Sequence, residues 1–583
     1  MTDYDRTHLS QDRTPLIDAI RKYVDEGPAF FRVPGHRFER GVDAAVLDLL
    51  GEKAYRADLT EAEGLDDLHH PSGAILEAEK LAADLYGSDY CWFLVNGTTS
   101  GNEAMILSVV GPGEKILIDR NAHRSVFQGL ILSGAVPVWI MPRAYPGWDL
   151  TGSVAPEAVE TALDKDPDIK AVFITSPTYY GVASDLRRIA EICHAYGLPL
   201  LVDEAHGSHL NFFSADTGAP EEAVAAGADL VSQSTHKTCG SMTESSMLHL
   251  QGNLVSRERT DACLKLVTST SPNYLLMSSL DGARHLMAQH GEELMTKALR
   301  LARMAEEGIA GIPGYRVLGY SSSENTANHT TADTPELYTE YAEIDGTSGD
   351  IQKEKSKCPG EVKRTSGKSE KTSGNRKTDR ELPQSVYGKD PLRLVFSACD
   401  AGISGNRLHE LLYQEGGVSC ELSDSRHVVC VITWGNTEED IHRLIDTCKI
   451  VRARYGSETT GRNFSETEAR YGFETSDNYS SGSDGRRETE TAEGVKSGRN
   501  FLLRPMTPMR MTPRQAFYSR KEKVPLEKAV GRIAAESITP YPPGVPIVCP
   551  GEELTEQTVR DALAYQDGSV GGNKANILVT SVS

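Results

Sequence analysis

A lysine stands directly after a short apolar stretch, in Ser234-Thr235-His236-Lys237. The stretch 229–232 (DLVS) is typical of a buried strand, and burial penalises the charged ammonium form of a lysine. The same penalty lowers the pKa of the amine and makes it a nucleophile that can form a Schiff base with a carbonyl compound. A lone lysine in a loop is more often a solvated surface charge, so this interpretation depends on suitable partners for Lys237.

An acidic residue ends a second apolar stretch. The segment 200–210 (LLVDEAHGSHL) runs from a hydrophobic strand into Asp203, Glu204 and His206. A carboxylate at the end of a strand can pair with a protonated pyridine nitrogen, which keeps an aromatic cofactor ring cationic and able to accept electrons. The alternative is an aspartate that caps the following helix.

Two further segments could bind the other parts of such a cofactor. The stretch 96–102 (NGTTSGN) is expected to form a turn between a strand and a helix, where small residues, hydroxyls and helix N-terminal amides can bind a phosphate. The segment 119–125 (DRNAHRS) contains His123, whose imidazole could stack flat on an aromatic ring. Either segment alone is also compatible with an ordinary turn or helix start.

The elements expected around these residues alternate between helices and strands. Apolar stretches rich in Val, Ile and Leu recur from about 70 to 250, and helical patterns separate most of them. This alternation predicts an α/β domain with a mostly parallel sheet covered by helices on both faces. Ligands of such sheets bind at the carboxyl ends of the strands, where the four segments fall. The expected strands are 91–95, 115–118, 137–140, 171–174, 199–202 and 229–232, and the expected helices include 75–86, 156–164 and 185–196.

Charge and composition narrow the class of protein. The chain has 583 residues, and 83 acidic against 61 basic side chains give a net charge of −22. Nucleic acids and anionic membranes attract basic surfaces, so neither is expected as a partner. No apolar stretch approaches the roughly 20 residues of a membrane span, and the polar N-terminus favours a cytoplasmic location. The ten cysteines form no CxxC pair and no zinc-like cluster, so no metal is expected.

Two low-complexity segments divide the chain. Residues 321–388 and 455–500 are rich in Ser, Thr, Gly and charged side chains, and they cannot bury enough apolar surface to offset the entropy of ordering them. They are expected to be flexible. The predicted organisation is an N-terminal segment 1–55, a large domain 56–300, a small α/β lobe 301–454 that contains the first insertion, an acidic linker 455–500 and a C-terminal domain 501–583.

The four chemical segments, in this order in one α/β domain, resemble fold-type I enzymes that use pyridoxal 5′-phosphate (PLP). More narrowly, the chain resembles the short, biosynthetic arginine decarboxylase-like branch of the Orn/Lys/Arg decarboxylase family. The resemblance implies an aspartate aminotransferase-like large domain with smaller α/β C-terminal lobes, and a PLP-dependent removal of CO₂ from a basic amino acid. Further segments that carry it are 31–36 (FRVPGH), 65–75 (LDDLHHPSGAI), 268–281 (TSTSPNYLLMSSLD), 390–395 (DPLRLV) and 539–546 (TPYPPGVP).

The resemblance also implies a role for each site residue. Lys237 would hold PLP as a Schiff base, Asp203 would bind the pyridine nitrogen, and His123 would stack on the ring. Ala205 would pack under the same ring. The residues implied to contact the phosphate are Thr98, Thr99, Ser234 and His236 and, across a subunit interface, Thr270 and Ser271. A homodimer or larger homo-oligomer is therefore expected, with the active site at the interface.

A basic substrate side chain needs an acidic partner in the pocket. The candidates are Glu536, Glu421 and Asp424, and a solvated surface carboxylate is the alternative for each. The short branch of the family favours arginine as the substrate, with agmatine as a product that feeds polyamine biosynthesis. Lysine and ornithine stay open, because the motifs are nearly shared.

Two other functions stay open as well. A fold-type I aminotransferase or another lyase would need an arginine in the small lobe to hold the α-carboxylate, and Arg393 or Arg407 could serve. A non-catalytic regulator could keep the fold without the chemistry. The intact candidate residues around Lys237 argue against such a regulator.

Overall fold

Short apolar stretches form a mixed central sheet. The computed structural model describes residues 9–320, 387–457, 507–539, 545–566 and 576–581. Within these residues the main sheet has the strand order β1-β10-β9-β8-β6-β2-β3. From β3 to β9 neighbouring strands are parallel, and β10 and β1 pair antiparallel at one edge. The bounds are β1 (Tyr90–Leu94), β2 (Lys115–Asp119), β3 (Val136–Ile140), β6 (Ile169–Thr175), β8 (Leu200–Asp203), β9 (Leu230–Gln233) and β10 (Ser246–Leu250).

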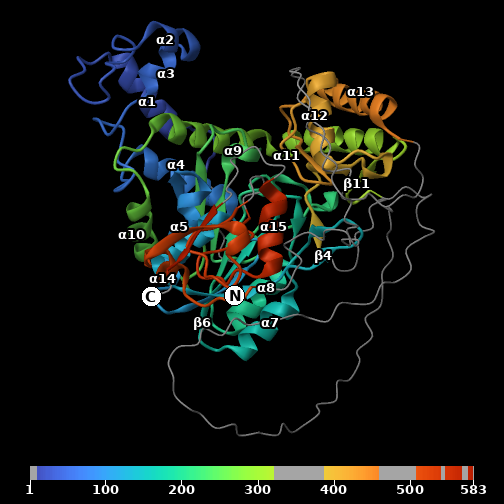
Figure 1. Cartoon of the computed structure of the whole chain (residues 1–583). Helices are drawn as coiled ribbons and strands as arrows, with labels where there is room; N and C mark the ends of the chain where they lie inside the picture. The colour runs from blue at the N-terminus through green and yellow to red at the C-terminus, as the bar shows by residue number, and fades with distance from the viewer. Residues whose placement is uncertain (1–8, 321–386, 458–506, 540–544, 567–575, 582–583) are drawn as a thin grey trace, which may run out of the picture.

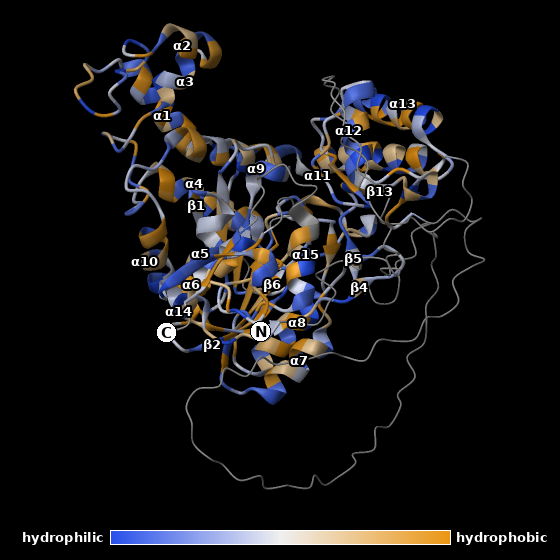
Figure 2. Cartoon of the chain, in the orientation of Figure 1, coloured by the Kyte–Doolittle hydropathy of each residue, from blue (hydrophilic) through white to orange (hydrophobic). Residues whose placement is uncertain are grey.

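The expected mostly parallel sheet is therefore confirmed, and each expected strand overlaps an observed one. Strand β10, which lies between β1 and β9, was not predicted from the sequence. Figure 2 shows the hydrophobic strands at the centre of the large domain, as expected for strands that are buried on both faces.

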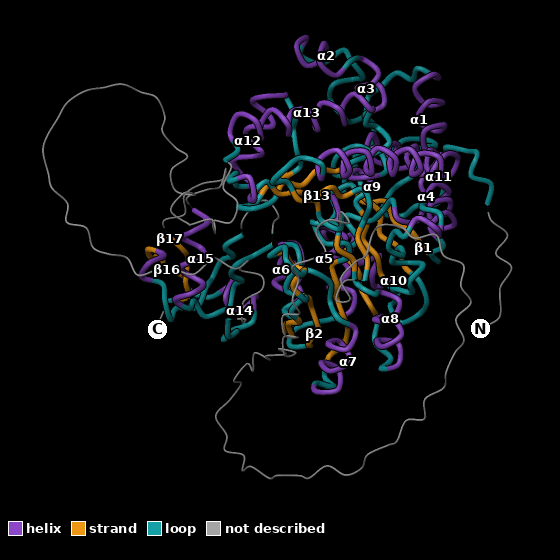
Figure 3. The backbone as a smooth tube through the Cα atoms, turned by 90° about the vertical axis from the view of Figure 1, so that its right-hand side faces the viewer, coloured by secondary structure: helices purple, strands orange, loops and turns teal. Residues whose placement is uncertain are grey.

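Helices cover both faces of this sheet. One apolar core packs under α5 (Gly97–Val109), α6 (Arg124–Ser133) and α10 (Arg257–Val267), and a second packs under α7 (Pro156–Lys165) and α8 (Leu186–Ala195). The layers are visible in Figure 3, where the strands stand between helices. Short pairs lie outside the main sheet: β4 (Ala144–Tyr145) with β5 (Leu150–Thr151), and β7 (Val182–Ala183) with β12 (Gly388–Lys389).

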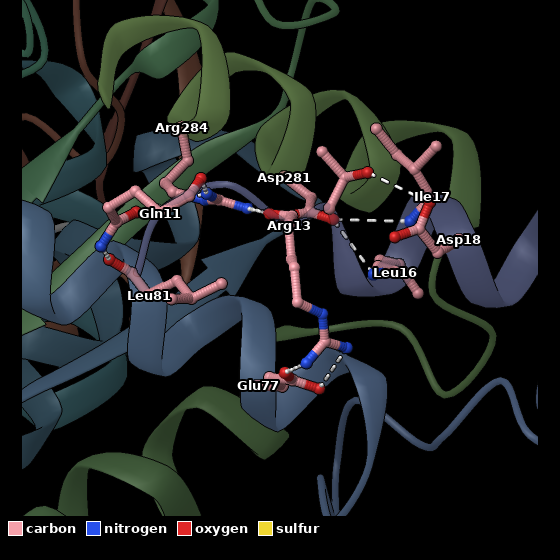
Figure 4. A network of polar contacts seen from close by, with 10 residues as sticks. Gln11, Arg13, Leu16, Ile17, Asp18, Glu77, Leu81, Asp281 and Arg284 are labelled. Carbon is pink, nitrogen blue, oxygen red and sulfur yellow. Dashed lines mark hydrogen bonds and ion pairs between the residues drawn. The ribbon is translucent and has the colours of Figure 1, made fainter. Parts of the chain in front are cut away.

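The N-terminal segment is fastened to the long helix α11 (Tyr274–Ala310) by buried charges. Asp281 accepts hydrogen bonds from the backbone amides of Leu16 (3.0 Å) and Ile17 (3.4 Å), and it pairs with Arg284 at 2.5 Å. Arg284 donates to the carbonyl of Arg13 at 2.6 Å, and Figure 4 shows this network from close by. The other elements of this region are α1 (Pro15–Glu26), α2 (Ala44–Leu50), α3 (Glu52–Ala57) and α4 (Ala74–Tyr86).

The small lobe has an antiparallel sheet in the order β11-β13-β15-β14. Helices α12 (Gly405–Gly416) and α13 (Glu438–Tyr455) pack together beside it. Helix α11 contacts α13 and runs without a break through residue 300, where the sequence analysis places a boundary. The strand bounds are β11 (Arg316–Val317), β13 (Arg393–Ser397), β14 (Leu422–Ser423) and β15 (Val428–Val431).

The C-terminal region has a small apolar core of its own. Arg120 fastens it to the large domain by donating to the carbonyls of Pro546 (2.8 Å) and Ile547 (3.2 Å). The elements are α14 (Pro513–Tyr518), β16 (Lys521–Pro525), α15 (Glu556–Gln566) and β17 (Asn576–Thr580). Most of the two low-complexity segments and the centre of 539–546 lie outside the described residues. None of the helices that the structure describes is both long and apolar enough to pass through a bilayer.

Candidate active site

The candidate site forms at the carboxyl ends of the parallel strands. Asp203 is the last residue of β8, and Lys237 lies in α9 (Thr235–Thr238) directly after β9. His123 caps the N-terminus of α6 after β2. Because parallel strands bring their carboxyl ends to one edge, residues far apart in sequence gather there.

Lys237 is partly buried among polar and aromatic groups. Its Nζ lies 3.0 Å from Nε2 of His206 and 5.7 Å from the centre of the Tyr179 ring. Burial lowers the pKa of the Lys237 amine to about 8; nearby Asp203 opposes this shift and Arg393 adds to it. At pH 7 roughly a tenth of such an amine is uncharged and nucleophilic, far more than for an exposed lysine.

Asp203 is 3 % exposed and is held by two hydrogen bonds. Its Oδ2 accepts from Nδ2 of Asn102 at 2.7 Å, and its Oδ1 accepts from the backbone amide of Ala205 at 3.1 Å. These two donors fix the orientation of both carboxylate oxygens. The group is therefore suited to pair with a cationic ring nitrogen.

His123 is linked to Asp203 through Asn102 and Ser125. Nδ2 of Asn102 also donates to Oγ of Ser125 (2.9 Å), which lies 2.9 Å from Nδ1 of His123. Burial lowers the pKa of His123 to about 4, partly opposed by Asp203. The imidazole is therefore neutral at physiological pH, which suits stacking against a cationic aromatic ring.

Hydroxyl groups meet at the start of α5. Oγ1 of Thr98 hydrogen-bonds to Oγ of Ser234 and lies 3.3 Å from Oγ of Ser246. His236 contacts the carbonyl of Ser245 through Nδ1 at 2.8 Å. Thr99 lies in the same helical turn as Thr98 and is partly exposed. Hydroxyls beside the free amides of a helix N-terminus form a suitable anion site.

The stretch 96–102 is not the simple turn that the sequence analysis expects. Helix α5 begins at Gly97, inside the stretch that was expected to be a turn, so Thr98, Thr99 and Gly101 are helical. Gly and Thr favour turns in isolation, but the packing decides here. A Cβ on Gly101 would lie 2.2 Å from Oγ of Ser232, so only glycine lets α5 approach β9 this closely.

Several buried polar atoms of the site have no hydrogen-bond partner among the described residues. They are Oδ1 of Asn102, Oγ1 of Thr235 and Nε of Arg393. Buried polar groups are nearly always paired, so this set indicates that a polar ligand belongs here. A flat ring with a phosphate, held between the start of α5 and Asp203, fits these donors and acceptors.

No role was predicted from the sequence for Asn102, His206 or Tyr179, and Arg393 was considered only as a carboxylate-binding residue of an aminotransferase. Arg393 is 1 % exposed and donates from Nη2 to Nδ1 of His206 at 2.9 Å. Arg407 instead lies on the exposed surface of α12, paired with Glu410 at 2.9 Å. The four-residue spacing of Thr98 and Asn102, which puts both on one helix face, could have identified Asn102.

The three candidate acids for the substrate side chain lie in different settings. Glu421 is exposed, and its charge favours the ammonium form of Lys237. Asp424 accepts from the hydroxyl of Tyr180 (2.8 Å) and lies 2.9 Å from Nδ1 of His427. Glu536 accepts from the amide of Leu578 (2.9 Å) inside the C-terminal region.

Thr270 and Ser271 are exposed in the loop between α10 and α11. Among the described residues, no hydrogen bond joins their side chains to Lys237 or to the start of α5. In the part of the chain that the structure describes, no group of three His, Cys, Asp or Glu side chains is arranged to hold a metal ion.

Comparisons with known proteins show the family and the fold of the chain. Residues 14–440 match the model of the Orn/Lys/Arg decarboxylase major domain, and residues 498–567 match that of its C-terminal domain. An arginine decarboxylase of Bacillus subtilis is 32 % identical over 551 residues, which cover 94 % of this chain and 93 % of that protein. An arginine decarboxylase of Halalkalibacterium halodurans is 34 % identical over 550 residues, covering 94 % and 92 %. The crystal structure of a Francisella novicida lysine decarboxylase superposes with a TM-score of 0.70 at 20 % identity, over 97 % of this chain and 81 % of that one.

Proposed function

The chain belongs to the Orn/Lys/Arg decarboxylase family, and from this premise we propose that it converts arginine to agmatine and CO₂ with PLP held at Lys237. One observation carries the proposal: a lysine with a lowered pKa, a fixed carboxylate and a neutral histidine gather at one sheet edge beside a helix N-terminus. The names of the similar Bacillus and Halalkalibacterium proteins support arginine as the substrate.

The site residues fit PLP group by group. Nζ of Lys237 would hold the cofactor, Asp203 would hold a proton on the ring nitrogen, and His123 would stack on the ring with Ala205 below it. PLP, when bound, supplies an electron sink for the electron pair that departing CO₂ leaves behind. The groups proposed to hold the phosphate are Thr98, Thr99, Ser234, His236 and the first amides of α5.

The protein supplies orientation and electrostatics for this chemistry. Asn102 keeps the carboxylate of Asp203 in place, and Ser125 keeps the imidazole of His123 in place. The first contact is buried and the second is partly buried, so these groups are largely held in place before the reaction begins. Lys237 is the group with accessible proton exchange near neutral pH, and we assign to it the proton returned to Cα of the substrate.

Glu421 is the candidate acid that the structure favours for the substrate guanidinium. It is exposed and lies within the electrostatic field of Lys237, whereas Asp424 and Glu536 already accept internal hydrogen bonds. A carboxylate binds a guanidinium with two charge-assisted hydrogen bonds, which a lysine or ornithine substrate cannot form in the same way. Asp424 and Glu536 stay secondary candidates.

We infer that the working unit is a homodimer or a larger homo-oligomer. Thr270 and Ser271 are exposed and available to reach a partner subunit's phosphate site. The N-terminal region also exposes large apolar side chains, including Phe31 (89 %) and Leu49 (79 %), and apolar exposure of this kind favours association. A cytoplasmic location is part of the same proposal, and the free cysteines among the described residues support it.

A side-by-side assay of arginine, lysine and ornithine tests the proposal. Purified protein with PLP should release CO₂ and agmatine from arginine with a kcat/KM at least about tenfold above that for the other two amino acids. A higher kcat/KM for lysine or ornithine would overturn the substrate assignment. Formation of a keto acid instead of CO₂ would favour an aminotransferase with Arg393 on the α-carboxylate, and no product with any substrate would favour a regulator.

A further inference from the structure

His206 lies between Arg393 and Lys237 in the candidate site. Its Nδ1 is 2.9 Å from Nη2 of Arg393, and its Nε2 is 3.0 Å from Nζ of Lys237. The Tyr179 ring packs against the imidazole with the ring centres 4.4 Å apart. Both nitrogens of the imidazole are therefore engaged, and the ring is fixed in orientation.

The contact with Arg393 determines where the imidazole carries its proton. A guanidinium has five N–H donors and no acceptor, so Nδ1 of His206 must present a lone pair to Arg393. A neutral imidazole with an unprotonated Nδ1 carries its proton on Nε2. Nε2–H can then only donate, and an ammonium group on Lys237 offers no acceptor for it. The contact at 3.0 Å therefore requires the lone pair of a neutral amine.

We propose that Arg393 and His206 act as positioning residues that select the neutral amine of Lys237, which is the form that bonds to the cofactor once Nζ leaves the hydrogen bond from His206. This inference rests on the proposed role of Lys237. Bonding of Nζ to the aldehyde carbon of PLP releases the aldehyde oxygen and the two amine protons as one water. An ammonium group would first have to lose a proton, so selection of the neutral form speeds attachment.

Contacts on both sides of the chain segment that carries Arg393 fix its position. Arg393 begins β13, one of the two inner strands of the small-lobe sheet, three residues after Asp390. Asp390 is buried and contacts Nε2 of His209 at 3.0 Å. Two bridges, His209–Asp390 and His206–Arg393, thus join the segment after β8 to the small lobe. The protonation state of Lys237 therefore depends on the position of the small lobe, which carries Arg393.

Other charges around Lys237 act in both directions. Asp203 and Glu421 favour the ammonium form, and Arg393 disfavours it. The imidazoles of His123, His206 and His236 also face this region and have lowered pKa values, mainly through burial, so they stay neutral and add no charge near pH 7. A hydrogen bond from His206 should therefore shift the equilibrium between the ammonium and the neutral amine forms of Lys237 measurably.

The test is the pH dependence of PLP attachment to cofactor-free enzyme, followed by stopped-flow absorbance. We expect a midpoint at about pH 8 for the wild type. In His206→Leu the midpoint should rise by about one pH unit, which makes attachment about tenfold slower at pH 7. In His206→Gln the midpoint should stay within about half a unit, because the amide can accept from Arg393 and donate to Nζ.

Arg393→Met provides a second variant, and Arg407→Met a matched control that removes an exposed arginine of the same lobe. Arg393→Met should raise the midpoint as well, and Arg407→Met should leave it unchanged. An unchanged midpoint in folded His206→Leu would overturn the inference while leaving the proposed function intact. No attachment by the wild type at any pH would overturn the proposed function itself.

The ¹⁵N spectrum of histidine-labelled, cofactor-free enzyme gives a direct readout that needs no PLP. The signals absent from His206→Gln belong to His206, and they should show an unprotonated Nδ1 and a protonated Nε2 at pH 7. A protonated Nδ1 would overturn the inference, whatever the outcome of the attachment assay.

Discussion

The amide of Asn102 donates to the carboxylate of Asp203 over 2.7 Å, although 101 residues separate them in the chain. The same amide donates to Ser125, which holds His123. One side chain of α5 therefore aligns the two groups that are proposed to contact the cofactor ring.

Replacing Asn102 with alanine should weaken PLP binding. A hydrogen bond to a charged group contributes about 1.5–3 kcal/mol, so we expect the Kd for PLP to rise about 10- to 100-fold. Equilibrium titration of cofactor-free enzyme with PLP measures it. Asn211→Ala is the control, because that amide donates to the carbonyl of Leu85 at 3.1 Å, away from the site. Equal affinities of Asn102→Ala and wild type would contradict the role of Asn102.

The burial of Asp281 predicts a large effect on stability. Asp281→Ala leaves Arg284 without its ion-pair partner and the amides of Leu16 and Ile17 without an acceptor. Loss of one partner of a buried pair costs about 3–5 kcal/mol in the free energy of unfolding, which urea denaturation can measure. Asp446→Ala removes the exposed pair with Lys449 and should cost less than about 1 kcal/mol. A loss in Asp281→Ala as small as that in Asp446→Ala would show that the contacts of Asp281 contribute little to the free energy of unfolding.

Because Glu79 is buried, we expect the free energy of unfolding to fall as pH rises. Burial raises the pKa of Glu79 from 4.5 to about 8, partly opposed by the hydrogen bond from the amide of Phe93. Between these values the folded state keeps a proton that the unfolded state releases, so the group stabilises the fold at low pH and this contribution is lost as pH rises towards 8. Glu79→Gln should reduce the slope by up to about 1.4 kcal/mol per pH unit in denaturation at several pH values.

Exposed Glu439 on α13 is the matched control for this prediction. Its side chain is 84 % exposed, so Glu439→Gln should leave the pH dependence of stability as in the wild type. If Glu79→Gln also leaves the slope unchanged, Glu79 is ionised in the folded protein and the burial argument is wrong.

Replacing Glu421 should reduce kcat/KM for arginine. Glu421→Gln keeps the shape of the side chain but removes the charge, so we expect kcat/KM for arginine to fall about tenfold or more. Steady-state kinetics of agmatine formation measures the change. The matched control is Glu410→Gln on α12, a carboxylate paired with Arg407 at the surface. Unchanged kinetics in Glu421→Gln would transfer the substrate role to Asp424 or Glu536.

The large-domain fold and the order of its chemical segments could be predicted from sequence, because buried parallel strands are continuous apolar stretches with polar residues at their carboxyl ends. The predicted lysine, aspartate and histidine indeed gather at one edge of the sheet. Strand β10 pairs antiparallel with β9, which lies shortly before it in the chain, and with β1, which lies far earlier, and it was not predicted from the sequence.

The contacts between distant segments could not be predicted. His206 and Arg393 are 187 residues apart, and neither local propensity nor spacing indicates that they meet. Helix α5 begins inside the expected turn because its small residues pack against β9, an interaction that local propensity does not include. Glu536 accepts a hydrogen bond from the amide of Leu578 in β17, a contact that the sequence does not indicate, and its proposed substrate role stays a prediction.

Chemical trapping at Lys237 tests the central claim most directly. Borohydride reduction of enzyme incubated with PLP, followed by proteolysis and mass spectrometry, identifies the lysine that holds the cofactor. The account predicts that the pyridoxyl group is attached to the peptide containing Lys237 and is absent from Lys237→Ala. A pyridoxyl group on another lysine alone, or none on any peptide, would contradict it.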